Sequence, residues 1–386
     1  MFETFVCTLS MMSFVALIGP LARALGLAPW QAGMAVTVGG IAWALSARIW
    51  GAASDRRGRR RVLLQGLSGF VLSYAALCAF IVWALQHLPP VWLAFAGVVL
   101  LRGLAGGFYA AVPATGAALI ADHVAPHKRA GAMATLGAAS AIGMVAGPGL
   151  TGLLTAHGLA LPLYITAVLP LIALVVLWRW LPRTEHHAAA DAAALKIGDL
   201  RLRRPLAVAF VAMFSVTVAQ VAVGFFAMDR LHLDGAGAAR AAGIALTAVG
   251  VALILAQLLV RTLDWPPARL IRIGCLISAA GFGSVLFATA PPALWAGYFV
   301  AAAGMGWVFP SVPALAANSV QAHEQGAAAG TVAAAHGLGM IVGPLAGTLI
   351  YDIDPGAPYV LVAALLVLAA LWPQRSAVMR EAAHGH

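Results

Sequence analysis

Charged residues are scarce in this sequence. Only 9% of its 386 residues are Asp, Glu, Lys or Arg, whereas 62% are hydrophobic and the mean hydropathy is +0.93. A soluble chain of this length needs far more polar surface. The three cysteines, Cys7, Cys78 and Cys275, have neither paired nor metal-ligand spacing. The composition therefore excludes an ordinary soluble domain, argues against disulfides and a metal site, and indicates a chain solvated mostly by lipid.

Carboxylates are missing from the middle of every long apolar run. All 13 acidic residues fall at the ends of these runs or between them. The sequence also lacks a glycine-rich phosphate loop and a convergent set of nucleophile and acid–base residues. We therefore expect neither an ATP-driven pump nor an enzyme, and no cofactor.

Long apolar runs are abundant. About 20 residues in a helix cross the roughly 30 Å of a hydrocarbon core, and Gly and Ala dominate the runs, which favours packed helices over barrel strands. The first run begins without the basic residues of a signal peptide. We predict an all-α polytopic membrane protein with twelve spans, over approximately residues 4–26, 31–53, 62–85, 91–121, 130–155, 160–181, 205–228, 241–262, 269–289, 291–317, 326–350 and 358–374.

One long polar interruption and one internal repeat divide the chain in two. Residues 137–154 match residues 333–350 at a constant offset of 196, with G-M-x-x-G-P in both copies. Duplicated halves related by an axis along the membrane normal are a transporter architecture, with the substrate bound between them. We predict a six-helix bundle over residues 1–181, a cytoplasmic linker over 182–204, a second six-helix bundle over 205–374 and a cytoplasmic tail over 375–386.

The basic residues predict the orientation. Cytoplasmic loops retain Lys and Arg, and with both termini inside, only Arg23, Arg230 and Arg240 fall outside. The net charge of +10 is therefore a topology signal and does not indicate nucleic-acid binding. We expect a multi-pass protein of the cytoplasmic (inner) membrane.

Three motifs resemble those of a known family. Residues 51–60, GAASDRRGRR, match its G-x-x-x-D-R-x-G-R-R loop, Arg102 and Gly106 match an R-x-x-x-G pattern, and residues 143–152 match its span-five motif, with Thr151 where a glycine is usual. The chain thereby resembles the major facilitator superfamily, specifically its twelve-span drug:proton antiporter branch. The resemblance covers essentially the whole chain.

The loop motif predicts a cytoplasmic gate. A carboxylate at Asp55 can accept charge-assisted bonds from a guanidinium and from the start of a facing helix. A simple positive-inside anchor would explain the arginines but neither Asp55 nor the glycines. What the resemblance implies is a charge cluster that holds the cytoplasmic side shut, made of Gly51, Asp55, Arg56, Gly58, Arg59, Asp122 and Arg129.

The repeated motif predicts bent helices. Small residues four apart let helices touch, and proline removes a backbone donor and bends a span. This is either a packing kink or, as the resemblance implies, a bend between spans five and eleven that closes the outer side. The residues are Gly143, Gly147 and Pro148, with Gly339, Gly343 and Pro344.

Two deep ionisable side chains are the candidates for proton coupling. Arg102 lies roughly 17 Å and His336 roughly 15 Å from the nearer end of its run, at about 1.5 Å per residue. Intramembrane ionisable residues are functional candidates because their burial is costly. Histidine titrates near physiological pH, so His336 is either a proton carrier or a neutral, hydrogen-bonded histidine. Many relatives carry a span-one acid that is missing here; Asp55 and Asp122 are the alternative titrating groups.

These observations predict the function. We expect a monomeric secondary active transporter that exports a drug-like or lipophilic small molecule in exchange for protons by alternating access. An exporter of a specific metabolite (sugar, amino acid or metallophore) and a facilitator not coupled to protons are the alternatives. The candidate cavity residues, each of which packing would also explain, are Gln220, Tyr109, Trp43, Trp307 and Asn318.

Overall fold

The computed structural model describes residues 1–124, 126–181, 199–260, 265–321 and 324–372. Every regular element among these residues is a helix. The first half contains α1 (Phe2–Ala24), α2 (Pro29–Arg57), α3 (Arg59–His87), α4 (Val91–Tyr109), α5 (Ala111–His123), α6 (Pro126–Leu154), η1 (Thr155–His157) and α7 (Ala160–Trp180). The second half contains α8 (Arg203–Asp229), α9 (Gly235–Val260), α10 (Pro267–Val285), α11 (Pro291–Ala317), α12 (Gln325–Tyr351) and α13 (Ala357–Leu371).

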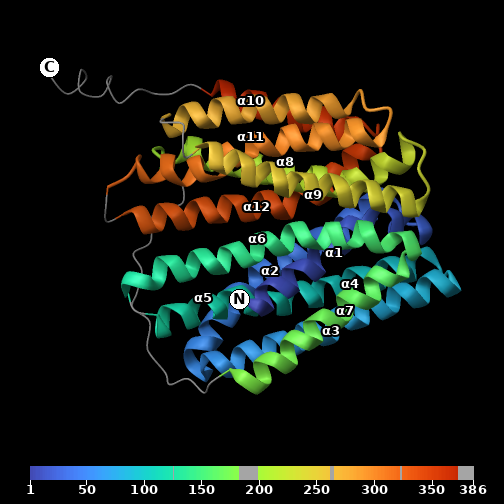
Figure 1. Cartoon of the computed structure of the whole chain (residues 1–386), viewed down its shortest axis with the longest axis horizontal. Helices are drawn as coiled ribbons and strands as arrows, with labels where there is room; N and C mark the ends of the chain where they lie inside the picture. Colours follow the sequence, from blue (N-terminus) through green and yellow to red (C-terminus); the bar gives the residue numbers. More distant parts are fainter. Residues whose placement is uncertain (125, 182–198, 261–264, 322–323, 373–386) are drawn as a thin grey trace.

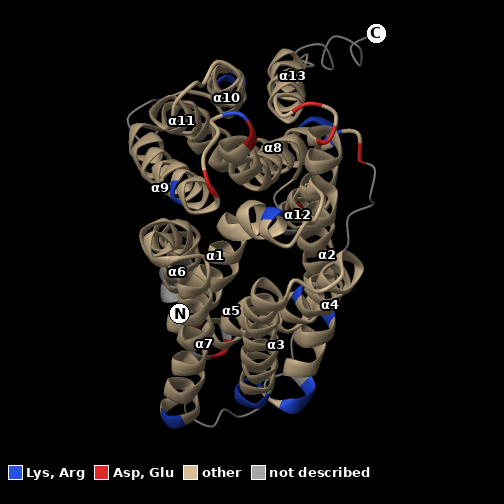
Figure 2. Ribbon diagram, turned by 90° about the vertical axis from the view of Figure 1, so that its right-hand side faces the viewer, with Lys and Arg blue, Asp and Glu red and all other residues tan. Residues whose placement is uncertain are grey.

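The helices form two bundles. Helices α1 to α7 lie in one half of the molecule and α8 to α13 in the other (Figures 1 and 2). Among the described residues, eleven helical segments are long and apolar enough to cross a membrane, with α4 and α5 counted together, and α13 is a shorter apolar helix. The predicted all-α class with twelve spans in two bundles is confirmed. The linker residues 182–198 and the predicted tail lie outside the described residues.

Two predicted spans differ most from the observed helices. The fourth span is interrupted at Ala110, between α4 and α5. Pro113 explains the break, because a proline clashes with the carbonyl four residues earlier, here that of Tyr109. Helix α9 begins at Gly235, before the expected residue 241, because Asp234 accepts a hydrogen bond from the Gly237 N–H at 2.9 Å and caps the helix.

A buried tyrosine ties the core of each bundle to its first helix. The Tyr74 hydroxyl donates to the Ser10 carbonyl at 2.6 Å, and the Tyr298 hydroxyl donates to the Ala219 carbonyl at 2.7 Å. A buried hydroxyl without a partner would destabilise the fold. These bonds therefore fix α3 against α1 and α11 against α8.

The helices run between two ends of the molecule, the Arg59 end and the Arg23 end. The Arg59 end holds the turn between α2 and α3, the end of α5 and the start of α12. The Arg23 end holds the end of α1, the start of α2 and the ends of α8 and α12. The bundles meet mainly through four helix pairs, α2 with α12, α6 with α9, and α1 with both α8 and α9.

Candidate functional site

At the Arg23 end, α2 and α12 approach closely because Gly33 has no side chain. A Cβ atom at residue 33 would lie 2.6 Å from the Pro344 carbonyl oxygen and would also collide with Thr348. Further along, the Thr37 hydroxyl donates to the Ile341 carbonyl at 2.9 Å. Backbones that touch in this way exclude water and side chains between the bundles.

The α6–α9 contact is built in the same way. A Cβ atom at Gly243 of α9 would lie 2.6 Å from the Pro148 carbonyl oxygen and 2.7 Å from the Gly152 Cα of α6. Between α1 and α8, a Cβ atom at Gly19 would lie 2.9 Å from the Phe225 nitrogen. The close approaches at Gly33, Gly243 and Gly19 lie towards the Arg23 end, which they close.

An ion pair joins the two bundles at the same end. Arg23 of α1 donates to the Asp229 carboxylate of α8 at 2.5 Å, and the Tyr351 hydroxyl of α12 donates to the same carboxylate at 3.0 Å. The Asp352 carboxylate, just after α12, accepts the backbone N–H of Trp30 in the first turn of α2. Burial nevertheless raises the pKa of Asp352 above its usual value.

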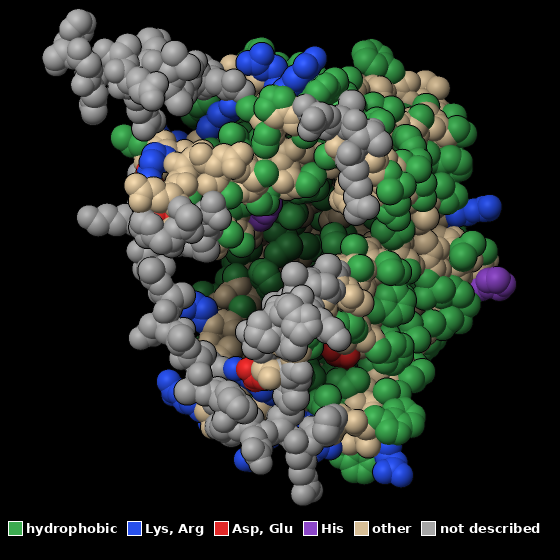
Figure 3. Space-filling view, turned by 60° about the vertical axis from the view of Figure 1, so that its left-hand side comes forward, with side chains coloured by type: hydrophobic (Ala, Val, Ile, Leu, Met, Phe, Trp, Pro, Cys, Tyr) green, Lys and Arg blue, Asp and Glu red, His purple; other side chains and the backbone are tan. Residues whose placement is uncertain are grey.

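The Arg59 end is hollow. Figure 3 shows a depression between the bundles whose visible floor consists mostly of hydrophobic side chains. Glycines on the half-helices nearest this end have open space beside them: at Gly51, Gly137, Gly330 and Gly337 a Cβ atom would meet nothing within 4 Å. At these positions of α2, α6 and α12, therefore, no neighbouring helix packs closely against the glycine.

The predicted gate residues lie at the Arg59 end, and two of them form an ion pair. The Arg59 guanidinium donates through Nε to Asp122 at 2.9 Å and through Nη1 to the Ser54 hydroxyl at 2.7 Å. Gly58 turns the chain between α2 and α3 with φ of 89°, where L residues are strained. Arg56 is exposed. The side chains of Asp55 and Arg129 lie outside the described residues.

A second charged cluster lies at this end in the other bundle. Arg201 donates to both carboxylate oxygens of Glu324, each at 2.9 Å, and to Asp199 at 2.6 Å. Hydrogen bonds from Arg201 hold the pKa of Asp199 below its usual value. Asp199 is only partly buried at the surface, so solvent screening keeps this contribution to stability small; it is present at neutral pH and is lost as the pH falls through the lowered pKa.

The first two glycines of each motif copy pack inside their own bundle, whereas the Pro148 and Pro344 carbonyls face the other bundle. A Cβ atom at Gly143 would lie 2.6 Å from the Phe5 carbonyl of α1, and one at Gly339 would lie 2.6 Å from the Phe210 carbonyl of α8. Gly147 and Gly343 make equally close contacts with the same two helices. Pro148 and Pro344 lie within α6 and α12. Across the bundles, α6 packs mainly on α9 and α12 on α2, so the bends predicted in spans five and eleven face those partners rather than each other.

Arg102 is buried inside the first bundle, with 4% of its surface exposed. Its Nη1 lies 3.3 Å from the Met11 sulfur, and its guanidinium carbon lies 5.4 Å from the Phe14 ring centre. Gly39 makes room for it, since a Cβ atom there would lie 2.8 Å from Nη1. No carboxylate among the described residues pairs with Arg102, and its Nε has no partner there. A buried, incompletely solvated cation is costly.

His336 belongs to the other bundle. Its ring packs edge-on against Phe309 at 5.8 Å, and its Nε2 is buried without a hydrogen-bond partner among the described residues. The structure therefore places the two predicted coupling residues in different bundles, on α4 and α12.

The predicted cavity residues have different surroundings. The Tyr109 hydroxyl bonds to the Thr8 hydroxyl at 2.8 Å, and Trp307 packs edge-on against Trp265 at 5.9 Å. Asn318 is the exposed C-cap of α11. Gln220 and Trp43 are half-buried, and the indole nitrogen of Trp43 has no partner among the described residues.

Sequence reasoning missed the cross-bundle ion pair. Arg23 and Asp229 stand 206 residues apart, each beside an ordinary span end. It also missed the role of Arg60 in the loop motif. The Arg60 guanidinium donates to the Leu181 and Trp178 carbonyls at 2.7 and 3.0 Å and so caps α7. The helix-end position of Arg23 was a usable signal, but its partner was not identifiable without the fold.

Comparison with known proteins extends these observations. The tetracycline resistance protein, class C, of Escherichia coli is 30% identical over 80% of this chain and 76% of its own length. The class G protein of Vibrio anguillarum is 28% identical over 80% and 77%. Solute carrier family 22 member 18 of Rattus norvegicus is 28% identical over 91% and 87%.

Solved structures share the fold. A bacterial homologue of the human lysosomal transporter Spinster, described as inward-facing and unoccupied, superposes with a TM-score of 0.74 at 14% identity over 95% of this chain and 93% of that one. The human organic anion transporter MFSD10 gives 0.64 at 19% identity over 96% of each chain. The sequence profile of the Major Facilitator Superfamily matches residues 1–295 and 237–381, and this chain, a membrane transporter, belongs to that superfamily.

Proposed function

We propose that this protein exports a small organic molecule, drug-like or lipophilic, from the cytoplasm across the inner membrane in exchange for protons. The observation that carries the proposal is the asymmetry between the ends: the bundles touch at the Arg23 end and are hollowed at the Arg59 end. The Arg59 end carries most of the basic residues, so the positive-inside rule makes it cytoplasmic, with both termini on that side. The hollow is then open to the cytoplasm, where an exporter loads its substrate.

The contacts between the bundles support alternating access as the mechanism. Helices α2 and α12 already touch near Gly33 and Thr348. Rocking about such a contact would separate the bundles at the Arg23 end and bring the end of α2 against the start of α12. In that state Asp55, near the end of α2, would face a helix N-terminus, which attracts a carboxylate. The Arg59–Asp122 ion pair fixes the turn between α2 and α3, next to Asp55.

The curated relatives favour export of a drug-like molecule, because several of them are named tetracycline resistance proteins. The hydrophobic floor of the hollow suits an apolar or aromatic substrate. The absence of a carboxylate beside Arg102 in the described part of the chain keeps an uncoupled facilitator as the alternative, and a specific metabolite remains an alternative substrate.

Proton coupling is assigned to His336 and Arg102. The Nε2 of His336, which has no hydrogen-bond partner among the described residues, offers a group that can gain and lose a proton. Arg102 supplies a fixed positive charge in the opposite bundle. The transporter works as a monomer, since one chain contains both bundles, and its partners are the substrate, protons and lipid.

The proposal is tested with the purified protein in liposomes that contain a pH-sensitive dye. Lipophilic compounds and metabolites are added under an imposed proton gradient, and substrate and proton movement are measured together. Substrate-dependent, stoichiometric proton flux is expected. Substrate movement without proton flux would establish a facilitator, and movement of one metabolite alone would establish a specific exporter.

Replacing His336 with alanine should remove the pH dependence of transport while some exchange remains, because the titrating group is lost and the bundles are intact. The pH profile of exchange in the same liposomes checks this. Exposed His157 provides a control through His157→Ala, which should keep the wild-type profile. An unchanged profile in His336→Ala would place the proton on another group.

Replacing Asp55 with asparagine should leave the protein folded but reduce transport at least about tenfold, the effect of losing roughly 1.4 kcal/mol of charge interaction in the closed gate. Transport in liposomes and the melting temperature check the two parts. The matched variant Asp234→Asn changes an acid at the Arg23 end, where asparagine can still cap α9. Near-normal transport by Asp55→Asn would contradict the gate.

A further inference from the structure

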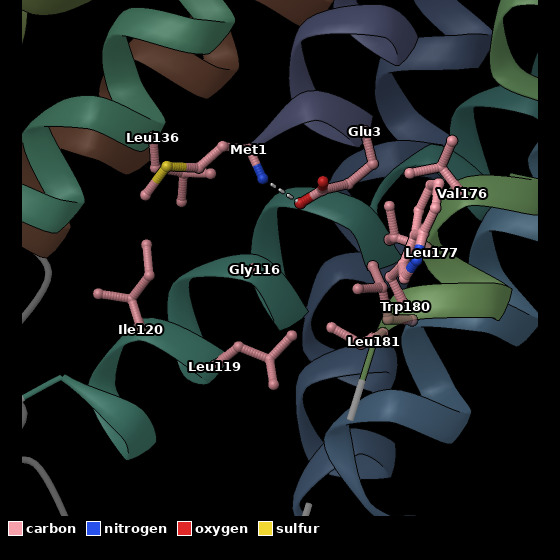
Figure 4. A pocket seen from close by; sticks show the side chains of 11 residues that line it. Met1, Glu3, Gly116, Leu119, Ile120, Leu136, Val176, Leu177, Trp180 and Leu181 are labelled. Carbon is pink, nitrogen blue, oxygen red and sulfur yellow. Dashed lines mark hydrogen bonds and ion pairs between the residues drawn. The ribbon is translucent and has the colours of Figure 1, made fainter. Parts of the chain in front are cut away.

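A separate pocket lies within the first bundle at the Arg59 end. It has a volume of about 280 Å³ and lies between α1, α3, α5, α6 and α7. Figure 4 shows its walls, which are formed mainly by apolar side chains such as Ile120, Leu136 and Leu177, with Trp180 at one side. None of the residues assigned to the gate, to proton coupling or to the central cavity lines it.

The pocket contains one charged side chain, the carboxylate of Glu3, which is 6% exposed. A buried carboxylate is unfavourable unless a cation or donors compensate it. Gly116 of α5 faces the Glu3 carboxylate without a side chain. A Cβ atom added at residue 116 would lie 3.9 Å from Glu3 Oε1. The pocket therefore combines apolar walls with a single buried anion.

The structure also shows what this anion accepts. The amino group of Met1 lies 2.6 Å from Glu3 Oε1, and Met1 itself lines the pocket (Figure 4). Met1 thus presents a primary ammonium attached to a flexible apolar chain. It is also 39% exposed, so its place is open to exchange with a ligand of the same chemistry.

We propose that this pocket binds a primary ammonium carried on an apolar chain, with the ammonium on Glu3 and the chain along Ile120, Leu136 and Leu177. The volume is just below the roughly 300–1,000 Å³ of pockets that enclose drug-sized ligands, so a single chain fits better than a polycyclic molecule. The ligand must carry an N–H donor, because the Met1 nitrogen lies 2.6 Å from Glu3 Oε1 in a charge-assisted hydrogen bond. A quaternary ammonium has no N–H and cannot form this bond. The source is either an aminophospholipid or a soluble long-chain amine.

The test uses the full chain in phosphatidylcholine nanodiscs, which contain no primary amine. Decylamine binding is measured by its effect on the melting temperature, with decanol and decyltrimethylammonium as matched probes. Decylamine should bind, and the two other probes should bind at least about tenfold more weakly, since one charge-assisted hydrogen bond is missing. Equal stabilisation by all three would overturn the proposal.

Two variants locate the site. Glu3→Gln should weaken decylamine binding about tenfold, whereas Asp234→Asn, at the other end, should not change it. An N-terminal extension that removes the charge from residue 1 should tighten binding several-fold, because Met1 no longer competes; this second variant retains Glu3. Unchanged affinity in both Glu3→Gln and the extended chain would refute the assignment.

A final comparison distinguishes the sources. Phosphatidylethanolamine in the nanodiscs should compete with decylamine if a lipid occupies the pocket, and should leave its affinity unchanged if a soluble amine does. Because the pocket lies outside the central cavity, transport in Glu3→Gln is expected to persist, so failure of this site and failure of the proposed export function give different results.

Discussion

Replacing Gly243 with leucine is expected to reduce transport at least about tenfold by preventing closure at the Arg23 end. A Cβ atom at this position would already lie 2.6 Å from the Pro148 carbonyl oxygen of the other bundle. Overpacking of a tight contact costs about 1–3 kcal/mol, which displaces a two-state equilibrium about five- to 150-fold. The strain falls between the bundles, so each bundle should still fold.

The conformational part of this prediction is measured with a reporter cysteine at Thr348. Thr348 is 1% exposed and lies at the α2–α12 contact. In a chain without its three native cysteines, a membrane-impermeant thiol reagent should modify this reporter about five- to 150-fold faster when Gly243→Leu is present, if the displaced equilibrium controls access.

The control is Gly283→Leu in α10, where a Cβ atom would meet nothing within 4 Å. It should leave both transport and reporter reactivity unchanged. If Gly243→Leu transports normally with a protected reporter, the α6–α9 contact does not close the Arg23 end.

The predicted fold and the predicted site differ in how well they follow from sequence. Apolar run length and the repeat at Gly143 and Gly339 predict spans and bundles because both are local patterns. The break at Ala110 was predictable too, had Pro113 been read as a helix terminator four residues after Tyr109.

Contacts between distant segments were beyond the same reasoning. Arg59 and Asp122 could be paired only through family resemblance, and Arg23 and Asp229, for which no motif exists, were not paired at all. Glu3 was one of the acids at a span end, yet α5 and α6 bury it beside an apolar pocket. Burial of a side chain at a helix end depends on neighbouring helices, and hydropathy along one helix does not report it.

Replacing Arg102 with methionine is expected to leave the melting temperature unchanged or higher while proton-coupled transport falls at least about tenfold. Arg102 is 4% exposed, and among the described residues its guanidinium contacts a sulfur and a ring rather than a carboxylate. Exchanging buried ion pairs for apolar side chains of similar volume is often neutral or stabilising by about 1–4 kcal/mol. Because Arg102 has no counter-ion in the described part of the chain, its replacement removes no ion pair there. Methionine beside Met11 and Phe14 would pack against the same apolar surfaces.

The matched variant is Arg59→Met, which removes an arginine that is also buried but is paired. Asp122 and Ser54 would lose their donor, so this variant should lower the melting temperature, since breaking a partly buried pair leaves an uncompensated charge. The two substitutions therefore have opposite expected effects on stability although both reduce transport. If Arg102→Met instead lowers the melting temperature as much as Arg59→Met, Arg102 holds the bundle together; if stability is kept and coupling is lost, its buried charge is retained for the proton step, at a cost to stability that only function explains.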